Sequence, residues 1–267
     1  MKGRLKENLA VLISSCDKFS DLWKEHIRLY RNNWQGEKVT TYLVTDKETD
    51  QSFEDIQIIV APSDFNFPMR IKYALQYIDA PYILLTLDDY FTITPIERDK
   101  LLYLSNRAET ENIDYLMLYD RRRDNSHKFT ALDVLEEIDL RKKYAVTLYP
   151  AIWNKEFLTK TVEDDLSPWL YEVSLTKSAL ETGAVCRFSP AGTFRILDVV
   201  RKGKVLHKAN RYFRKHGISI GDRPIISRVT EWKLAGMDIV DWYAPRWFVK
   251  FSKEVARKMG MQFFSEE

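Results

Sequence analysis

The chain has 267 residues, of which 45% are hydrophobic and 30% are charged, as is typical of a soluble globular protein. Its formal net charge of +2 does not indicate a nucleic-acid-binding protein. Its two cysteines, Cys16 and Cys186, argue against a disulfide framework or a Cys-rich metal site and favour a reducing cytoplasm. No apolar stretch is long enough to cross a bilayer, and the run at residues 9–13 is too short for a signal peptide.

Apolar runs and helical patterns alternate through the first half of the chain. Strands are predicted at residues 9–15, 39–45, 56–60, 82–87 and 114–118. Helices are predicted at residues 21–34, 69–77 and 95–108, with Ser20 as an N-cap and Pro95 at the first position of the third helix. This alternation predicts an α/β fold with parallel βαβ units and a doubly wound sheet.

The second half is divided by prolines into shorter elements, and it shows no composition break that would mark a domain linker. Residues 201–215 contain seven basic residues and no acidic residue. A final amphipathic helix is predicted at residues 245–259, with an aromatic face and a basic face. This helix could pack against the rest of the chain, form a homodimer or lie on an anionic membrane surface.

The predicted strand at residues 82–87 ends in two adjacent carboxylates, Asp88 and Asp89. Open α/β sheets bind their ligands at the carboxyl ends of such strands. Two hard oxygen ligands at this position suit Mg²⁺ or Mn²⁺, and these ions bind phosphates. The alternative is an acidic turn that binds nothing.

Several common nucleotide and metal sites are excluded by the sequence. Only Gly3 and Gly36 precede residue 183, so the glycine-rich phosphate loops of Rossmann and P-loop proteins are absent. The four histidines are scattered and lack the spacing of a helical zinc site. A bound nucleotide would therefore need another anchor, such as a metal on Asp88 and Asp89 that bridges a diphosphate.

The segment from Met69 to Tyr90 resembles the nucleotide-sugar-binding half of GT-A glycosyltransferases, especially those of the family-2 type. The resemblance consists of a helix with Arg70, followed by Ala80-Pro-Tyr-Ile-Leu-Leu-Thr-Leu-Asp88-Asp89. The run Val11-Leu-Ile-Ser14-Ser15-Cys16-Asp17 looks like the first strand and base-binding loop of that fold, and Tyr42-Leu-Val-Thr-Asp46 looks like its second strand. The resemblance covers residues 8–120 well and the remainder loosely.

A narrower similarity links the chain to uncharacterised bacterial glycosyltransferases of capsule and surface-polysaccharide synthesis. It rests on Asp88-Asp89-Tyr90-Phe91 and on Trp169-Leu-Tyr-Glu172. The chain departs from the usual Asp-x-Asp motif, because Tyr90 stands where the second acid is expected. Asp89 would then chelate the metal directly, and Asp88 would meet the ribose or act through water.

The resemblance implies roles for several residues in donor binding. Ser14, Ser15, Asp17 and Asp46 would lie near the nucleobase and ribose, although Ser and Asp also serve as ordinary turn and cap residues. Arg70 or Lys72 would contact phosphate, with a solvated helix residue as the alternative for Arg70. His207, in a basic segment at residues 200–207 that would cover the diphosphate, would complete the metal site; the alternative is a solvated loop.

Glu172 is the expected catalytic base. Ser167 as N-cap and Pro168 at the first helical position would place it one turn into a helix, where an inverting GT-A enzyme commonly carries its base. The alternative is a glutamate stabilised by the helix dipole. Trp169 would stack on the acceptor sugar, and Asp164 and Asp165 are alternative bases.

The resemblance thus implies a metal-dependent (Mn²⁺ or Mg²⁺), inverting hexosyltransferase that moves a sugar from a UDP-linked donor to a glycan or lipid-linked oligosaccharide in bacterial surface polysaccharide synthesis. Residues 1–205 would form the catalytic domain, with a donor half at 1–120 and an acceptor half at 121–205, and residues 206–267 would pack on it. The protein would be cytoplasmic or bound to the inner face of the plasma membrane. Alternatives are a sugar-phosphate nucleotidyltransferase and a non-catalytic carbohydrate-binding or scaffold protein.

Overall fold

The computed structural model describes residues 7–120, 131–162 and 166–243. The chain divides into two compact units, Met1–Asp198 and Val199–Glu267, which we describe separately. The amphipathic helix predicted at residues 245–259 lies outside the described residues, as do Asp164 and Asp165. No helix among the described residues combines the length and the apolar character that a membrane span needs.

The first unit is built on an eight-stranded sheet with the order β4-β3-β1-β5-β10-β8-β11-β9. Neighbours from β4 through β5 are parallel, and so are β8 and β11. The strands are β1 (Leu9–Ser14), β3 (Thr41–Thr45), β4 (Ile56–Val60), β5 (Tyr82–Leu87), β8 (Tyr115–Met117), β9 (Glu136–Glu137), β10 (Ala151–Asn154) and β11 (Cys186–Phe188). The predicted α/β fold with a mostly parallel sheet is confirmed.

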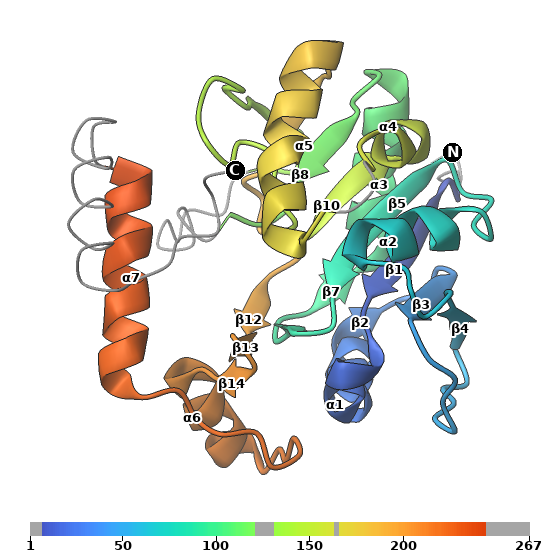
Figure 1. The fold of residues 1–267 in the computed structure, drawn as a ribbon. Helices are drawn as coiled ribbons and strands as arrows, with labels where there is room; N and C mark the ends of the chain where they lie inside the picture. Colours follow the sequence, from blue (N-terminus) through green and yellow to red (C-terminus); the bar gives the residue numbers. More distant parts are fainter. Residues whose placement is uncertain (1–6, 121–130, 163–165, 244–267) are drawn as a thin grey trace. The chain divides into compact units, whose positions relative to one another are not determined.

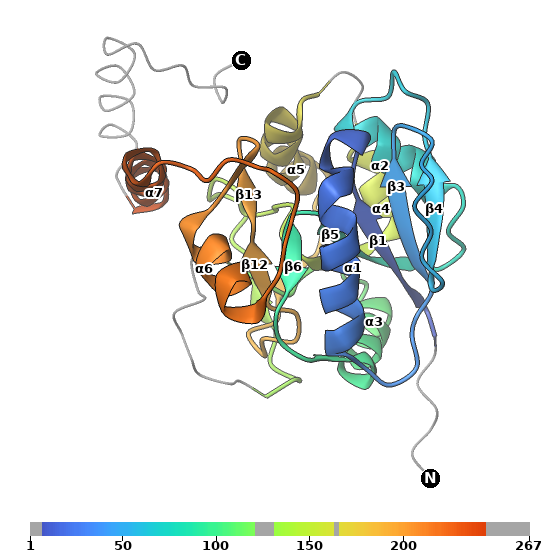
Figure 2. The ribbon, with the colours of Figure 1, turned by 90° about the horizontal axis from the view of Figure 1, so that it is seen from below.

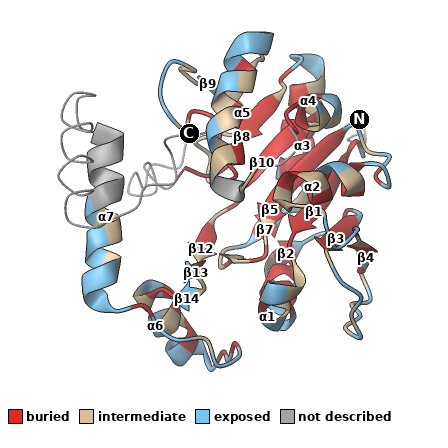
Figure 3. Cartoon of the chain, in the orientation of Figure 1, coloured by how far each residue is buried: buried red, intermediate tan, exposed pale blue. Residues whose placement is uncertain are grey.

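Helices cover both faces of this sheet, as Figures 1 and 2 show. One apolar cluster joins α1 (Ser20–Asn33) and α3 (Arg98–Thr110) to one face. A second cluster joins α2 (Phe67–Leu75), α4 (Lys155–Lys160) and α5 (Pro168–Thr182) to the other face. The central strands are buried on both sides (Figure 3), which explains why β1 and β5 are continuous apolar runs instead of alternating ones.

The third predicted helix begins later than the sequence indicates. Pro95 was expected at its first position, but α3 starts at Arg98. The intervening β7 (Ile96–Glu97) pairs in parallel with β2 (Trp34–Gln35), and Ile96 is fully buried. Tertiary pairing therefore overrides the helical pattern both in β7 and at Trp34, which was expected to be helical.

A short ladder outside the main sheet extends the strand that follows the acidic motif. Strand β6 (Tyr90–Thr92) pairs antiparallel with β12 (Ile196–Asp198), and this register sets Asp198 opposite Tyr90. Helix α1 contacts β6 from the side of the α1/α3 cluster. The ladder brings the end of the first unit to the residues that follow β5.

The second unit begins with a hairpin of β13 (Val200–Arg201) and β14 (Lys204–Val205). Its two turn residues both have positive φ, 52° at Lys202 and 74° at Gly203, as a two-residue turn of the I′ type requires. Two helices follow, α6 (His207–His216) and α7 (Arg228–Tyr243). Gly217, with φ 61°, ends α6 in the left-handed conformation that glycine adopts at low cost.

Candidate active site

The carboxyl edge of the sheet has a topological switch point between β1 and β5. From β1 the sheet grows through β3 to β4 on one side, and β5 then pairs on the other side of β1. Ligands of open α/β sheets bind in the crevice at such a point. The predicted residues gather there, because Ser14 ends β1 and Ser15 follows it, while Asp46 follows β3 and Asp88 follows β5.

A hydrogen bond between Ser15 and Asp88 spans this switch point. The Ser15 hydroxyl donates to Asp88 Oδ2 and accepts a hydrogen bond from Trp23 Nε1 at 2.7 Å. Both Ser15 and Asp88 are buried, and a buried carboxylate is costly unless it is hydrogen-bonded. The hydroxyl therefore fixes one oxygen of Asp88, and Trp23 on α1 fixes the hydroxyl.

Arg70 on α2 holds the loop that follows β1. Its Nε donates to the Ser15 carbonyl at 3.2 Å and its Nη1 donates to the Phe65 carbonyl at 2.9 Å. The side chain is buried, which excludes the solvated alternative considered for Arg70. Lys72 is exposed and lies two residues further along the helix, so it projects from a different side and is not brought together with Arg70.

The loops after β1 and β3 are joined by a short network. Asp46 Oδ1 accepts a hydrogen bond from the Asp17 amide at 2.7 Å, and Lys47 Nζ lies 2.9 Å from Asp17 Oδ2. Cys16 belongs to the loop after β1. Burial raises the pKa of its thiol, and the charge of Asp88 raises that pKa further. A thiol that stays protonated is a poor nucleophile, so we assign Cys16 a packing role and not a reactive one.

His26 lies beneath the acidic motif, where the sequence did not predict a site residue. Its side chain is buried, and its ring meets Phe91 edge to face with centroids 5.4 Å apart. Burial lowers the pKa of His26 to about 4, and the nearby Asp88 backbone opposes part of that shift. The imidazole is therefore neutral near pH 7. His26 follows Trp23 by three residues, on the same buried face of α1. This spacing could have indicated from the sequence that His26 is buried near the site.

The charges of three carboxylates act on Tyr90, the residue that replaces the usual second acid. Desolvation raises the pKa of Tyr90 well above its ordinary range, and the neighbouring Tyr149 raises it further. The ring centroids of these two tyrosines are 5.8 Å apart. The remaining contributions come from three carboxylates: Asp89, Asp198 and Glu172. The predicted metal ligand Asp89 and the predicted base Glu172 thus both raise the pKa of the same side chain.

Glu172 is held by the loop that precedes β10. Its Oε1 accepts a hydrogen bond from the Leu148 amide at 3.1 Å. The predicted cap of its helix is present, with the Leu170 amide donating to Ser167 Oγ at 3.3 Å and a proline in the first turn of α5. The side chain of Trp169, the predicted acceptor platform, lies outside the described residues.

Two carboxylates of this edge were missed by the sequence analysis. Asp198 faces Tyr90 only because the three-residue strands β6 and β12 pair over a long separation in the chain. Asp120 is buried just after β8, a strand that points the same way as β5. The apolar run before Asp120 was recognisable, so its strand-end position was a usable signal.

The donor atoms of this edge fit a hard divalent cation. Asp88 and Asp89 offer carboxylate oxygens, which Mg²⁺ and Mn²⁺ prefer. Among the described residues, no group of three or more His, Cys, Asp or Glu side chains forms a metal site by itself. An ion here would therefore complete its coordination with phosphate oxygens and water. His207, the predicted third ligand, lies at the start of α6 in the second unit.

Comparisons with solved structures find the same fold in two glycosyltransferases. The mannosyltransferase PcManGT from Pyrobaculum calidifontis, in complex with GDP-Man and Mn²⁺, matches 96% of this chain and 76% of its own, with 14% identity and a TM-score of 0.54. S. aureus TarS 1-349 matches 70% of this chain and 59% of its own, with 12% identity and a TM-score of 0.50. No protein-family model and no curated protein matches the sequence.

At these identities the likeness establishes the fold alone. In this chain the fold consists of a mostly parallel sheet covered by helices on both faces, with the candidate ligand-binding residues at the carboxyl ends of its strands. The chain therefore has the glycosyltransferase fold that its sequence predicted.

Proposed function

We propose that this chain transfers a sugar from a nucleotide-sugar donor to a hydroxyl of a glycan acceptor, in the synthesis of a bacterial surface polysaccharide. The observation that carries the proposal is the hydrogen bond between Ser15 and Asp88 across the switch point, with Asp89 beside it. The mannosyltransferase of the same fold binds GDP-Man and Mn²⁺, which supports a nucleotide sugar and a divalent ion as ligands here. The donor nucleotide would be UDP, as the sequence predicts, or GDP, the nucleotide of the mannosyltransferase donor.

The acidic motif would bind the donor diphosphate. Asp89 would hold Mn²⁺ or Mg²⁺ together with phosphate oxygens, while Asp88, oriented by Ser15, would face the ribose. A bound ion would neutralise the charge that develops on the leaving diphosphate. Arg70 keeps the loop after β1 in place through the Ser15 carbonyl, so that Asp17 and Asp46 can meet the base and ribose.

Glu172 would act as the general base of an inverting reaction. Its carboxylate would accept the proton of the acceptor hydroxyl while that oxygen forms a bond to the anomeric carbon. The bond from the anomeric carbon to the diphosphate breaks at the same time, and the nucleoside diphosphate leaves with the electron pair. The Leu148 amide orients the carboxylate for this step.

Nucleotide binding tests the proposal directly. Titration of the full chain with UDP, GDP and CMP, with and without Mn²⁺, should show one nucleotide that binds more tightly with the ion. At a free concentration of about 100 times its Kd, that nucleotide should stabilise the fold by roughly 2.7 kcal/mol. Asp89→Asn should abolish the effect of Mn²⁺. Asp79→Asn, the same change at an exposed site before β5, is the control and should behave as wild type.

Each alternative predicts a different outcome. Absence of binding by all three nucleotides would contradict a glycosyltransferase. A nucleotidyltransferase would instead consume a nucleoside triphosphate and a sugar phosphate and release pyrophosphate. A carbohydrate-binding protein would retain its glycan affinity in Asp89→Asn.

Replacement of the proposed base should separate catalysis from binding. Glu172→Gln keeps the acceptor for the Leu148 amide but cannot take up a proton, so kcat should fall by about 10² to 10⁴. Donor affinity should stay within about twofold, because the substitution leaves the diphosphate site intact. An unchanged kcat would remove Glu172 from the mechanism, and retention of anomeric configuration in the product would contradict inversion.

A further inference from the structure

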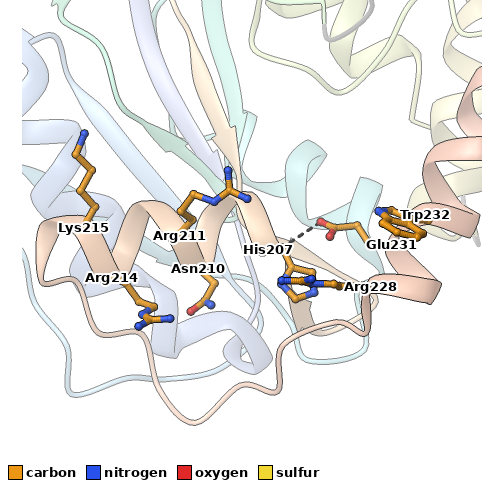
Figure 4. Close-up of a pocket in the computed structure, with 8 residues that line it drawn as sticks. All are labelled: His207, Asn210, Arg211, Arg214, Lys215, Arg228, Glu231 and Trp232. Carbon is orange, nitrogen blue, oxygen red and sulfur yellow. Dashed lines mark hydrogen bonds between the residues drawn. The ribbon is translucent and has the colours of Figure 1, made fainter.

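The second unit contains a cavity that the proposed reaction does not use. Its volume is about 690 Å³, within the range of small-molecule sites. It lies between α6 and the first turns of α7 (Figure 4). The lining residues are His207, Asn210, Arg211, Arg214, Lys215, Arg228, Glu231 and Trp232.

The lining is strongly basic. Four lining residues, Arg211, Arg214, Lys215 and Arg228, are cations, and Glu231 is the single carboxylate among the lining residues. Glu231 Oε1 accepts the His207 amide at 3.2 Å, so this carboxylate is committed to the start of α6. None of the four cations pairs with a carboxylate within residues 7–120, 131–162 and 166–243.

The spacing on α6 makes the cations a single stripe. Arg211, Arg214 and Lys215 lie three and four residues apart, on the same side of the helix as His207 and Asn210. The opposite side buries Ala209 and Phe213. Like charges held side by side repel one another, so an anion in the cavity would relieve this repulsion as well as bind.

An exposed aromatic side chain completes the lining. Trp232 is 72% exposed although it lies beside the cavity, and it follows Arg228 by four residues on the same side of α7. A large aromatic face next to clustered arginines offers stacking for a ring as well as charge for an anion.

We propose that this cavity binds the phosphate or diphosphate group of a molecule with two or more negative charges, and that Trp232 offers a stacking face to a ring attached to that group. Guanidinium groups bind phosphate oxygens through paired hydrogen bonds, so the site needs no divalent ion. This sets the cavity apart from the metal-dependent donor site proposed in the first unit, and it goes beyond the proposed function. The phosphate could belong to a soluble molecule or to a lipid headgroup.

Calorimetric titration of the full chain with inorganic pyrophosphate, in EDTA and at low salt, tests the proposal. Arg211→Gln/Arg214→Gln should weaken binding by at least about tenfold, because two charge-assisted contacts are lost. Lys204→Gln/Lys208→Gln removes the same charge from exposed positions of the same unit that do not line the cavity, and it should change the affinity by less than about twofold. Asp89→Asn should leave pyrophosphate binding unchanged, which separates this site from the donor site.

A second arm identifies the source of the phosphate. Co-sedimentation with phosphatidylcholine vesicles, with and without phosphatidic acid, should show binding only if a lipid headgroup is a ligand. Vesicle binding that is lost in Arg211→Gln/Arg214→Gln assigns a lipid, and pyrophosphate binding without vesicle binding assigns a soluble phosphate ester. Equal losses in the two double variants, or no binding to either probe, would overturn the proposal.

Discussion

Two neighbouring serines at the end of β1 differ in their contacts. The Ser15 hydroxyl donates to Asp88 and accepts from Trp23. Ser15→Ala therefore removes one hydrogen bond from each of these two buried side chains. The loss should destabilise the protein by about 1–3 kcal/mol. The Ser14 hydroxyl is buried and makes no hydrogen bond among the described residues, so Ser14→Ala should change stability by less than about 0.5 kcal/mol. Urea unfolding of both variants measures the difference, and equal losses would contradict the assigned network.

His26 should make stability depend on pH. Its folded pKa of about 4 lies below its ordinary value of 6.5, so the unfolded chain takes up the proton first as the pH falls. Stability is thus fully present above pH 6.5 and is lost as the pH falls towards 4. Between about pH 7 and about pH 5 the wild type should lose roughly 2 kcal/mol through this group.

His26→Gln should lack this part of the pH dependence, whatever its stability at neutral pH. His216→Gln, which changes an exposed histidine, is the control and should follow the wild type. Urea unfolding of the three proteins across this pH range provides the measurement. Parallel curves for the wild type and His26→Gln would show that the buried imidazole does not resist protonation.

At the scale of elements, helix α2 connects its own N-cap to the proposed donor site. The Asn66 side chain accepts the Met69 amide at 3.1 Å, and α2 carries Arg70, which holds the Ser15 carbonyl. Asn66→Ala should destabilise the protein by about 1 kcal/mol and should also weaken nucleotide binding, because the loop after β1 loses its anchor.

Asn154→Ala provides the matched comparison. Asn154 caps α4 by accepting the Phe157 amide at 3.0 Å, and α4 carries no residue of the site. Its loss should cost at least as much stability as the Asn66 substitution, because Asn154 also hydrogen-bonds Tyr82. Thermal unfolding and nucleotide titration of both variants decide the point. Equal effects of Asn66→Ala and Asn154→Ala on nucleotide affinity would contradict a role of α2 in donor binding.

Elements with strong local patterns were predictable, and those created by distant pairing were not. Strands β1 and β5 are recognisable in the sequence as continuous apolar runs, because both faces of the sheet are covered. Their parallel pairing then places Ser15 and Asp88 together at the carboxyl ends of the strands. The four residues of β10 are too few for a pattern. Likewise, β7 and β12 exist only through partners far away in sequence, so the later start of α3 and the position of Asp198 could not be predicted.

At the scale of the whole molecule, one sheet edge collects contributions from most of the first unit. The loops after β1, β3, β5 and β8 reach it from parallel strands. The loop before β10 reaches the same edge from the opposite direction, because β10 runs antiparallel to β5 and β8. The Leu148 amide therefore reaches Glu172, and the Tyr149 ring reaches Tyr90. An antiparallel strand needs no crossover helix to make these contacts.

The antiparallel β10 also dictates an order of assembly. It inserts between β5 and β8, although both of those strands are synthesised earlier. Until Ala151–Asn154 has left the ribosome, β5 presents an open hydrogen-bonding edge on a strand that is apolar along nearly all of its length. Such an edge pairs readily with other chains. A nascent chain that stops after β8 would thus be prone to aggregation, and the two sequence halves that meet at residue 120 cannot fold as independent pieces.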